Sequence, residues 1–250
     1  MIKIIAEIGQ NHNGDMSLAR ELIAAAKGSG ADVAKFQLYD AAALFPKERN
    51  EWYEYNCKTE INFDQALELA NECRRQGIEF MASPFDCERV RWLERLHVSQ
   101  IKLASRSICD TKLIEAIVAT NLPVIASLGL WTKSVFPTIG SFGQVSYLYC
   151  ICKYPTPLSD FYFDKVDFTK YSGFSDHSIG VTASIVAMSR GAKIIEKHFT
   201  LDKTMHGPDH AGSMTPNELK EISEFRKSLV QCLYGVKDET TKPPNIFSLS

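Results

Sequence analysis

The alternation of short apolar runs with longer stretches of helical period is the feature that most constrains the fold. Eight runs are rich in valine and isoleucine, and most are continuously apolar, as strands covered on both faces are. They span residues 2–9, 31–38, 79–83, 100–105, 123–128, 145–151, 173–176 and 193–198. Strands that alternate with helices form a parallel sheet. At 250 residues, eight such units predict an α/β fold, a single-domain (β/α)8 TIM barrel.

The intervening segments predict helices whose ends carry capping residues. These helices cover residues 16–29, 62–76, 87–96, 111–121, 134–142, 181–190 and 216–233. Asp15 and Asp110 are suitable N-caps, and Gly77 stands where a helix should stop. The barrel is expected to occupy residues 1–235, and residues 236–250 to form a C-terminal tail. The connections 39–61 and 153–171 are long and follow strands, so both should lie on the C-terminal face, where barrel active sites form.

Composition excludes several classes of protein. The net charge is -2 and no basic stripe is present, which argues against nucleic-acid binding. No window approaches 18 uninterrupted apolar residues, and the first residues lack the features of a signal peptide, so we expect a cytoplasmic protein without a membrane span. The seven cysteines should be reduced thiols. Cys150 and Cys152 would share one face of a strand, where packing is favoured over a metal or redox role.

Polar side chains stand at or just past the ends of most predicted strands. Parallel strands of a barrel end on one face, so these side chains should meet at one mouth. In chain order they are Glu7, Lys35 with Gln37, Ser83, Lys102 with Ser105, Ser127, Tyr154, Ser175 with His177, and Glu196 with His198.

Lys35 and Lys102 lie inside otherwise apolar strands, and a lysine is almost never buried without a partner. Two interpretations are open. Each lysine either reaches solvent from a strand end, or the two face an anionic ligand in the barrel mouth, which the sequence favours. Serines at neighbouring strand ends add neutral donors, so together these side chains predict a cradle for phosphate or carboxylate. No Walker-type glycine loop is present, which argues against a nucleoside triphosphate.

Four of the six histidines lie between His177 and His210. His177 and His198 end the last two predicted strands, which are adjacent in a closed barrel. Two imidazoles there can bind one divalent metal, with Glu7 or Asp209 completing a shell suited to Mn, Fe, Co or Zn. The spacing alone favours the alternative to a metal site, in which the two histidines form hydrogen bonds to a substrate or to the core. His12 is equally compatible with ordering its loop and with ligand binding.

Motifs through nearly the whole chain resemble the sialic acid synthase (N-acetylneuraminate synthase) family. They stand in family order and are Ala6-Glu-Ile-Gly-x-Asn-His-Asn-Gly14, Lys35-Phe-Gln37, Ser83-Pro-Phe-Asp86, Lys102-Leu-Ala-Ser105, Tyr154-Pro-Thr-Pro157, Gly173-Phe-Ser-Asp-His-Ser-Ile-Gly180, Glu196-Lys-His-Phe-Thr200 and Gly207-Pro-Asp-His210. The resemblance implies a (β/α)8 barrel that condenses phosphoenolpyruvate with an open-chain N-acyl hexosamine. The product is a 2-keto-3-deoxy sugar acid, phosphate is released, and a divalent metal, usually Mn, is required.

The resemblance also implies a role for each site residue. His177 and His198 would bind the metal, and Glu7 and Asp209 would flank the reacting atoms. Tyr154 would line the sugar pocket. Phosphoenolpyruvate would be bound by Lys35, Lys102, Ser105, Ser127 and Ser175, and Gln37 and Ser83 complete the expected substrate site.

The chain departs from the family pattern on the sugar side. The acid expected shortly after Ser105 is absent, because the segment reads Arg106-Ser-Ile-Cys109. The family has a Ser-Thr-Gly turn after the fifth strand, and this chain has Leu128 in place of the threonine. Cys152 stands where the family has an asparagine or another polar residue. The family's C-terminal antifreeze-like domain, which lends an arginine to the neighbouring subunit's sugar pocket, has no counterpart in these 250 residues.

These departures leave the acceptor sugar and the oligomeric state open. Arg106 and the connection 39–61 are candidates for replacing the lost contacts, and a barrel-to-barrel homodimer and a monomer are both compatible with the sequence. Two other functions are weighed against the synthase: a non-catalytic barrel that binds or regulates a full-length synthase, and another carbon-carbon lyase or isomerase on the same scaffold.

Overall fold

A computed structural model describes residues 2–140 and 144–235 and contains eight parallel strands within them. Their bounds are β1 (Lys3–Gly9), β2 (Val33–Leu38), β3 (Glu79–Pro84), β4 (Ile101–Leu103), β5 (Val124–Ser127), β6 (Val145–Cys150), β7 (Gly173–Asp176) and β8 (Ile194–His198). Each lies within or next to one of the eight apolar runs, so the predicted strands are confirmed.

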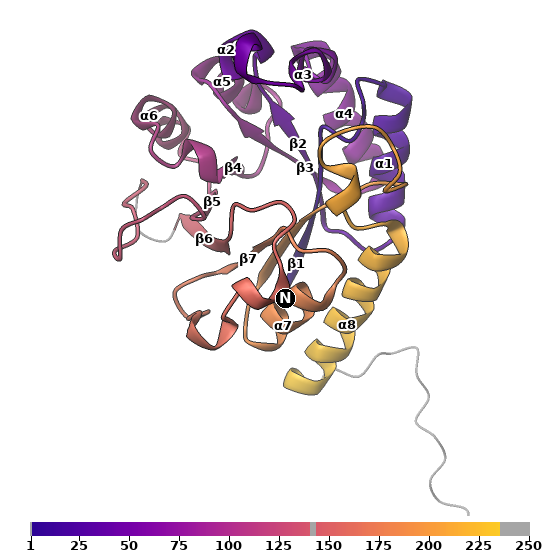
Figure 1. The fold of residues 1–250 in the computed structure, drawn as a ribbon, viewed down its shortest axis with the longest axis vertical. Helices are drawn as coiled ribbons and strands as arrows, with labels where there is room; N and C mark the ends of the chain where they lie inside the picture. Colours follow the sequence, from indigo (N-terminus) through magenta and orange to yellow (C-terminus); the bar gives the residue numbers. More distant parts are fainter. Residues whose placement is uncertain (1, 141–143, 236–250) are drawn as a thin grey trace, which may run out of the picture.

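The strands form one sheet in the order β3-β2-β1-β8-β7-β6-β5-β4. β3 and β4, at the two ends of this order, lie side by side, although no ladder joins them in the described part of the chain. The sheet is therefore a nearly closed barrel, and the predicted fold is confirmed (Figure 1).

In the described part of the chain six long helices surround the barrel, and all six were predicted. They are α1 (Met16–Gly28), α4 (Phe63–Gln76), α5 (Cys87–Arg95), α6 (Thr111–Ala119), α7 (Thr182–Ser189) and α8 (Pro216–Tyr234). Asp15 and Asp110 accept hydrogen bonds from the first backbone N–H groups of α1 and α6, as expected of N-caps. Gly77 ends α4 in the left-handed conformation, which glycine adopts without strain.

The helix predicted for residues 134–142 is wrong in its described part, because residues 134–140 are not helical and 141–142 lie outside the described residues. Pro137 lacks a backbone N–H and clashes with a preceding helical turn, and Gly140 adopts a positive φ of 63°. The next connection, between β6 and β7, contains only the 3-10 turns η3 (Leu158–Asp160) and η4 (Phe163–Lys165). This side of the barrel is covered by loops, as Figure 1 shows between α6 and α7.

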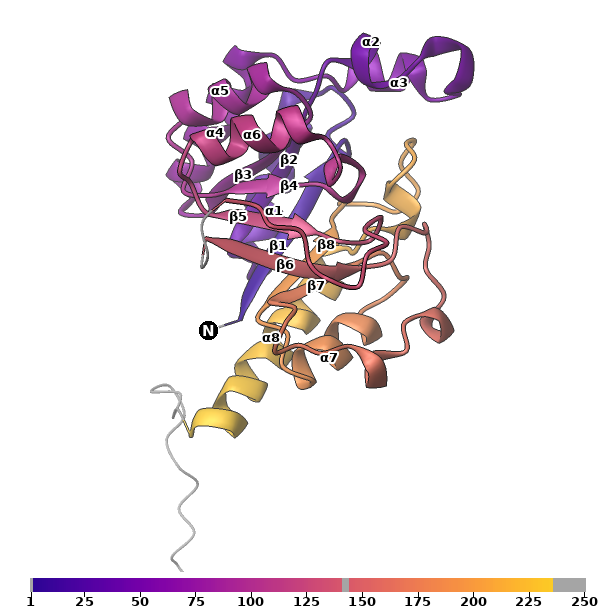
Figure 2. The ribbon, with the colours of Figure 1, turned by 90° about the vertical axis from the view of Figure 1, so that its left-hand side faces the viewer.

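The long connection after β2 is structured. It contains α2 (Ala41–Leu44), η1 (Lys47–Arg49) and α3 (Tyr53–Lys58), none of which the sequence pattern predicts. Figure 2 shows α2 and α3 beyond the ends of the strands, at the opposite end of the barrel from the N-terminus. The connection therefore lies on the C-terminal face, as predicted.

The barrel interior is filled in layers, as in other barrels of this type. An apolar cluster separate from the main core forms the lower layer and consists of Ile5, Val33, Met81, Ile125 and Leu148, with Ile194 packed against it. Because side chains two residues apart share one face of a strand, the next inward positions lie directly above this layer. They carry Glu7, Lys35, Ser83, Ser127, Cys150 and Glu196. The apolar layer is thus the floor of a polar chamber.

Candidate active site

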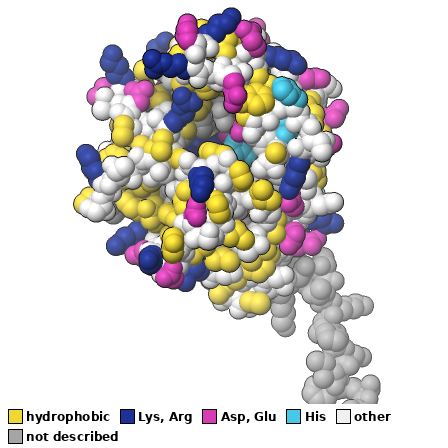
Figure 3. Space-filling model, in the orientation of Figure 1, with side chains coloured by type: hydrophobic (Ala, Val, Ile, Leu, Met, Phe, Trp, Pro, Cys, Tyr) yellow, Lys and Arg dark blue, Asp and Glu magenta, His cyan; other side chains and the backbone are white. Residues whose placement is uncertain are grey.

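A cavity of about 520 Å³ opens above this floor, at the C-terminal ends of the strands. Figure 3 looks onto this face, where histidine and basic side chains gather around a hollow. The cavity is lined by all twelve of the predicted site residues: Glu7, Lys35, Gln37, Ser83, Lys102, Ser105, Ser127, Tyr154, Ser175, His177, His198 and Asp209. The structure thus brings every predicted site residue to one place, and their individual roles remain predictions.

Lys35 is buried at the bottom of the cavity between two carboxylates. Its Nζ lies 2.9 Å from Oε2 of Glu196, with a hydrogen bond, and 3.2 Å from Oε2 of Glu7. Burial alone lowers the pKa of Lys35, but the two carboxylates outweigh it and raise the pKa. The interpretation in which this lysine escapes to solvent is wrong, and its charge is balanced inside the barrel.

Lys102 is equally buried but has weaker ion pairing. Its Nζ donates to Oγ of Ser127 at 2.7 Å and to the Leu103 carbonyl at 3.1 Å, and it lies 3.7 Å from Oε1 of Glu196. Burial lowers the pKa of Lys102, and Glu196 offsets part of that effect. Because no carboxylate of the described residues contacts Lys102 closely, its ammonium group is available to bind an anionic ligand.

Glu196 connects the two lysines and was not assigned a role from the sequence. Burial raises its pKa, but Lys102 and Lys35 outweigh burial and lower it to about 2, so Glu196 is ionised. Ser175 Oγ donates to its Oε1 at 3.0 Å. A glutamate inside an apolar strand indicates a functional site as strongly as Lys35 does. The pairing of β2 and β8 with β1 brings Glu196 and Lys35 together.

Three further side chains offer polar atoms to a ligand. Oε1 of Glu7 accepts a hydrogen bond from Gln37 at 2.9 Å, while Oε2 of Glu7 faces the Lys35 ammonium at 3.2 Å and has no well-aligned hydrogen-bond donor among the described residues. Ser83 Oγ is buried and likewise has no partner there. Ser105 Oγ accepts from the Leu130 N–H at 2.8 Å, and its own hydroxyl lies against the Cys152 thiol. Unsatisfied buried polar atoms are rare, so these atoms mark where a ligand is expected.

The His177 ring is held in one tautomer. Its Nδ1 lies 2.7 Å from the Ile151 carbonyl, which can only accept, so Nδ1 carries the proton and Nε2 carries a lone pair. The Tyr154 hydroxyl lies 2.8 Å from Nε2 and donates to that lone pair. Burial and the neighbouring His198 lower the pKa of His177 to about 4. His177 is therefore a neutral lone-pair donor at physiological pH.

His198 faces His177 across the mouth, with the ring centroids 6.0 Å apart. Nδ1 of His198 is buried without a hydrogen-bond partner in the described residues and lies 3.8 Å from Oδ2 of Asp209. Within the described part of the chain, no three histidine, cysteine or acidic side chains converge as a complete metal cluster. The two imidazoles and Asp209 nevertheless could supply some of the nitrogen and oxygen ligands of a metal ion, whose remaining coordination positions would be open to a substrate.

The charges in the cavity nearly cancel. Four cationic side chains line it, Lys35, Lys102, Arg106 and Lys197, together with three carboxylates, Glu7, Glu196 and Asp209. The fourth cation is neutralised beneath the cavity, because Nζ of Lys197 lies 3.2 Å from the buried Oδ2 of Asp176. A multiply charged anion therefore needs an additional cation in this cavity to bind without a large net negative charge.

Two cysteines line the cavity beside the serine donors. All seven cysteines of the chain are free, as predicted. The Cys150 thiol is buried, whereas Cys152 is exposed, and a hydrogen bond from Cys150 lowers the pKa of Cys152 to about 6, with Ser105 and Lys102 acting in the same direction. At neutral pH Cys152 is therefore expected to be a thiolate at the mouth of the barrel, which the interpretation of the pair as simple packing does not include.

The other histidines shape the loops around the mouth. Nδ1 of His12 accepts from the Gly14 N–H at 3.2 Å, which agrees with loop ordering. His210 is buried and hydrogen-bonds Thr200 and Asn13. His206 packs against the ring of Trp52, 5.3 Å between centroids, and so connects the loop after β8 to the connection after β2.

Comparison with known proteins places these residues in a family context. The model of the NeuB family matches residues 22–237. The N,N'-diacetyllegionaminic acid synthase of Legionella pneumophila is 36% identical over 88% of this chain and 69% of its own length. The N-acetylneuraminate-9-phosphate synthase of Homo sapiens is 32% identical over 88% of this chain and 67% of its own length.

Solved structures agree with the sequence comparisons. The crystal structure of an N-acetylneuraminic acid synthetase from Leptospira borgpetersenii, in complex with citrate, superposes with a TM-score of 0.87 at 30% identity, over 97% of this chain and 88% of that one. A truncated 3-deoxy-D-arabino-heptulosonate 7-phosphate synthase from Thermotoga maritima, at 14% identity and a TM-score of 0.66, shares the fold. No helix in the described ranges, 2–140 and 144–235, has the length and apolar character needed to cross a membrane.

Proposed function

Because the chain belongs to the NeuB family, we propose that it condenses phosphoenolpyruvate with an aldose, an N-acyl hexosamine, to give a sialic-acid-like 2-keto-3-deoxy sugar acid and phosphate. The observation that carries this proposal is the buried group of Lys35, Lys102 and Glu196 beneath a ring of serine hydroxyls. Burying such a group of charges is energetically costly, which indicates a function. An anion bound above it would interact with the lysine charges and with the hydroxyl donors around them.

Phosphoenolpyruvate carries a carboxylate and a phosphate, which fit the two kinds of donor in the cavity. In the proposal, Lys102 and Lys35 provide the positive charge, and Ser83 and Ser127 donate to the oxygen atoms. Ser175 and Ser105 would donate as well once their protons turn away from Glu196 and Cys152. Binding of the anion would draw Lys102 from Ser127, its present partner at 2.7 Å. Ser127 Oγ only accepts from Lys102, so its own proton is available to the ligand.

A divalent metal, Mn in our proposal, would be bound by His177 and His198, with Asp209 beside them. When bound, it would act as a Lewis acid that polarises the acceptor aldehyde and supplies the cation that the nearly neutral cavity lacks. His177 is already positioned for this role, because the bond from Nδ1 to the Ile151 carbonyl directs the Nε2 lone pair into the mouth. Tyr154 would release that lone pair and contact the sugar instead.

The residues around Glu7 suit the second half of the reaction. Attack of the phosphoenolpyruvate methylene on the aldehyde carbon leaves positive charge at C2, where water must add before the C–O bond to phosphate breaks. Gln37 donates a hydrogen bond to Oε1 of Glu7, and Oε2 lies 3.2 Å from the Lys35 ammonium, which keeps the carboxylate in place. In this proposal Oε2 accepts the proton of that water and stabilises the charge on C2.

A continuous assay of phosphate release from phosphoenolpyruvate tests the proposal. With MnCl2 and a panel of N-acyl hexosamines, we expect release that depends on both the metal and the aldose. The purified product should have the mass of the two substrates plus water minus phosphoric acid. Absence of release with every aldose at saturating metal would refute the synthase function.

A further inference from the structure

A second cavity of about 350 Å³ adjoins the first and shares Gln10, Phe45 and Arg106 with it. The second cavity lies between the connection after β2 and the end of β4. Its other lining residues are Leu44, Pro46, Arg49, Asn50, Trp52, Asn56 and Pro208. Two of its lining residues are arginines and none is acidic, so the local charge favours an anion.

Both arginines are without an acidic partner in the described part of the chain. Arg89, in contrast, is close to Glu60, Asp86 and Glu88. The Arg106 guanidinium lies 5.2 Å from the ring centre of Phe45 and 5.8 Å from that of Phe85. Stacking on two rings holds the guanidinium plane in place while its N–H groups remain available.

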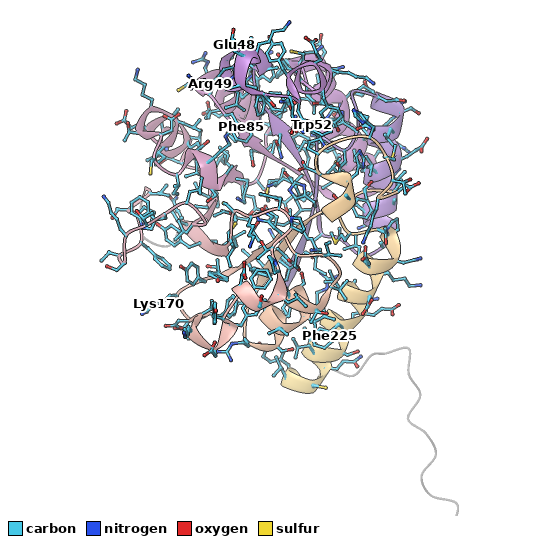
Figure 4. The ribbon with its side chains drawn as sticks, in the orientation of Figure 1. Glu48, Arg49, Trp52, Phe85, Lys170 and Phe225 are labelled. Carbon is cyan, nitrogen blue, oxygen red and sulfur yellow. The ribbon has the colours of Figure 1, made fainter. Side chains whose placement is uncertain are left out.

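Arg106 connects the second cavity with the mouth of the barrel. Arg106 directly follows Ser105, one of the proposed ligands of phosphoenolpyruvate, and lines both cavities. Figure 4 labels Arg49, Phe85 and Trp52 in the upper part of the molecule, near α2 and α3. Because Arg106 lines the first cavity together with His177 and His198, an open-chain aldose with its aldehyde at the histidines has Arg106 in the same cavity to receive its far end.

We propose that Arg106 and Arg49 bind a phosphate monoester at the end of the acceptor remote from its aldehyde, so that the preferred substrate is an aldose phosphate. This inference rests on the proposed function. Two guanidinium groups match a phosphate dianion, which has three oxygen acceptors, whereas one carboxylate is satisfied by a single arginine. Family membership does not decide the point, since the family includes proteins named for a free sugar acid and for a 9-phosphate.

Steady-state phosphate release with N-acetylmannosamine and with N-acetylmannosamine 6-phosphate tests the inference. We expect kcat/KM to be at least about tenfold higher for the phosphorylated sugar. Arg106→Gln and Arg49→Gln should each reduce the ratio of the two kcat/KM values by about ten- to a hundredfold, as loss of a hydrogen bond to a charged group does. The loss should appear in KM for the sugar phosphate.

Lys170→Gln is the matched control, because Lys170 is an exposed cation that pairs with Asp167 and lies on the opposite side of the molecule in Figure 4. It should leave the ratio unchanged. Preference of the wild-type protein for the neutral sugar would overturn the inference. So would arginine variants that lose activity equally with both sugars, or whose loss falls on KM for phosphoenolpyruvate.

Calorimetry separates this inference from the proposed function. Binding of N-acetylmannosamine 6-phosphate to the protein with phosphoenolpyruvate and Mn²⁺ omitted should be lost in both arginine variants and retained in Lys170→Gln. If phosphate release fails with every aldose but this binding pattern is found, the synthase function is wrong and the phosphate site stands. If release occurs and the binding pattern is absent, only the phosphate site is wrong.

Discussion

Lys35 donates a 2.9 Å hydrogen bond to Glu196, across 161 residues of sequence, and both side chains are almost fully buried. The two residues lie on β2 and β8, which flank β1 in the barrel. Glu7 on β1 completes the contact at 3.2 Å. Three neighbouring strands thus each contribute one charged side chain to the same layer, directly above the apolar floor.

Glu196→Gln should destabilise the protein by roughly 3 to 5 kcal/mol at pH 7, because it leaves buried lysines without their shared carboxylate. The free energy of unfolding from urea titrations would measure this. Glu221→Gln, at an exposed position on α8, is the control and should change stability by less than about 0.5 kcal/mol. Equal stability of the two variants would mean that Glu196 is not ionised in the folded protein.

The same pair predicts how stability depends on pH. The pKa of Glu196 is lowered to about 2 in the folded protein, below its unfolded value. Its stabilising contribution is therefore fully present above the unfolded pKa, near 4.5, and is lost as the pH falls from there toward 2. The stability difference between wild type and Glu196→Gln should shrink across that range, and urea titrations at pH 5, 4 and 3 would follow it.

His177→Ala and His198→Ala should each weaken Mn²⁺ binding by at least about tenfold and abolish phosphate release, because each removes one of two proposed nitrogen ligands. Calorimetric titration of Mn²⁺ gives the affinity independently of turnover. His97→Asn is the control, since His97 is exposed and has a positive φ of 53° that asparagine tolerates. Undiminished Mn²⁺ affinity in either alanine variant would contradict the metal assignment. EDTA should stop phosphate release by the wild-type protein, and excess Mn²⁺ should restore it.

The fold and the site residues could be predicted because their signals are local. Each strand is a continuous apolar run, and a lysine such as Lys35 inside such a run has few interpretations other than a site or a partner. The helix predicted for 134–142 was wrong because apolar residues at helical spacing were given more weight than Pro137 and Gly140. In that connection the local chain breakers decide the conformation.

The residues that were missed depend on contacts between distant segments. Glu196 and Lys197 have buried partners on other strands, Lys35 and Asp176, and only the register of the barrel brings them together. Arg106 and the connection 39–61 were predicted as candidate contacts for the sugar, but the cavity that Arg106 shares with Arg49 was not predicted, because no periodicity relates the two connections that form it. Cys152 was recognised as a neighbour of Cys150, but its lowered pKa depends on Ser105 and Lys102, which belong to another strand and its loop.

Cys152 should be the most reactive thiol of the described residues. With its pKa lowered to about 6, it is mainly a thiolate above pH 6, and the thiolate is the reactive form. At pH 7, iodoacetamide should modify Cys152 at least about tenfold faster than Cys73, whose pKa burial raises to about 12. Peptide mass spectrometry would measure both rates. Because Cys152 contacts Ser105, phosphoenolpyruvate should slow the modification if it binds where we propose.

Gly173 is predicted to be indispensable to the packing of β7 against β8. A Cβ atom at this position would lie 2.1 Å from the Ile194 carbonyl oxygen and 2.6 Å from Ile194 Cβ, so the two strands would have to separate. Gly173→Ala should therefore destabilise the protein by roughly 3 kcal/mol. Gly28→Ala is the matched control, because a Cβ there meets nothing within 4 Å at the end of α1, and it should be neutral or slightly stabilising. Since β7 and β8 lead to His177 and His198, Gly173→Ala should also weaken Mn²⁺ binding, whereas Gly28→Ala should not.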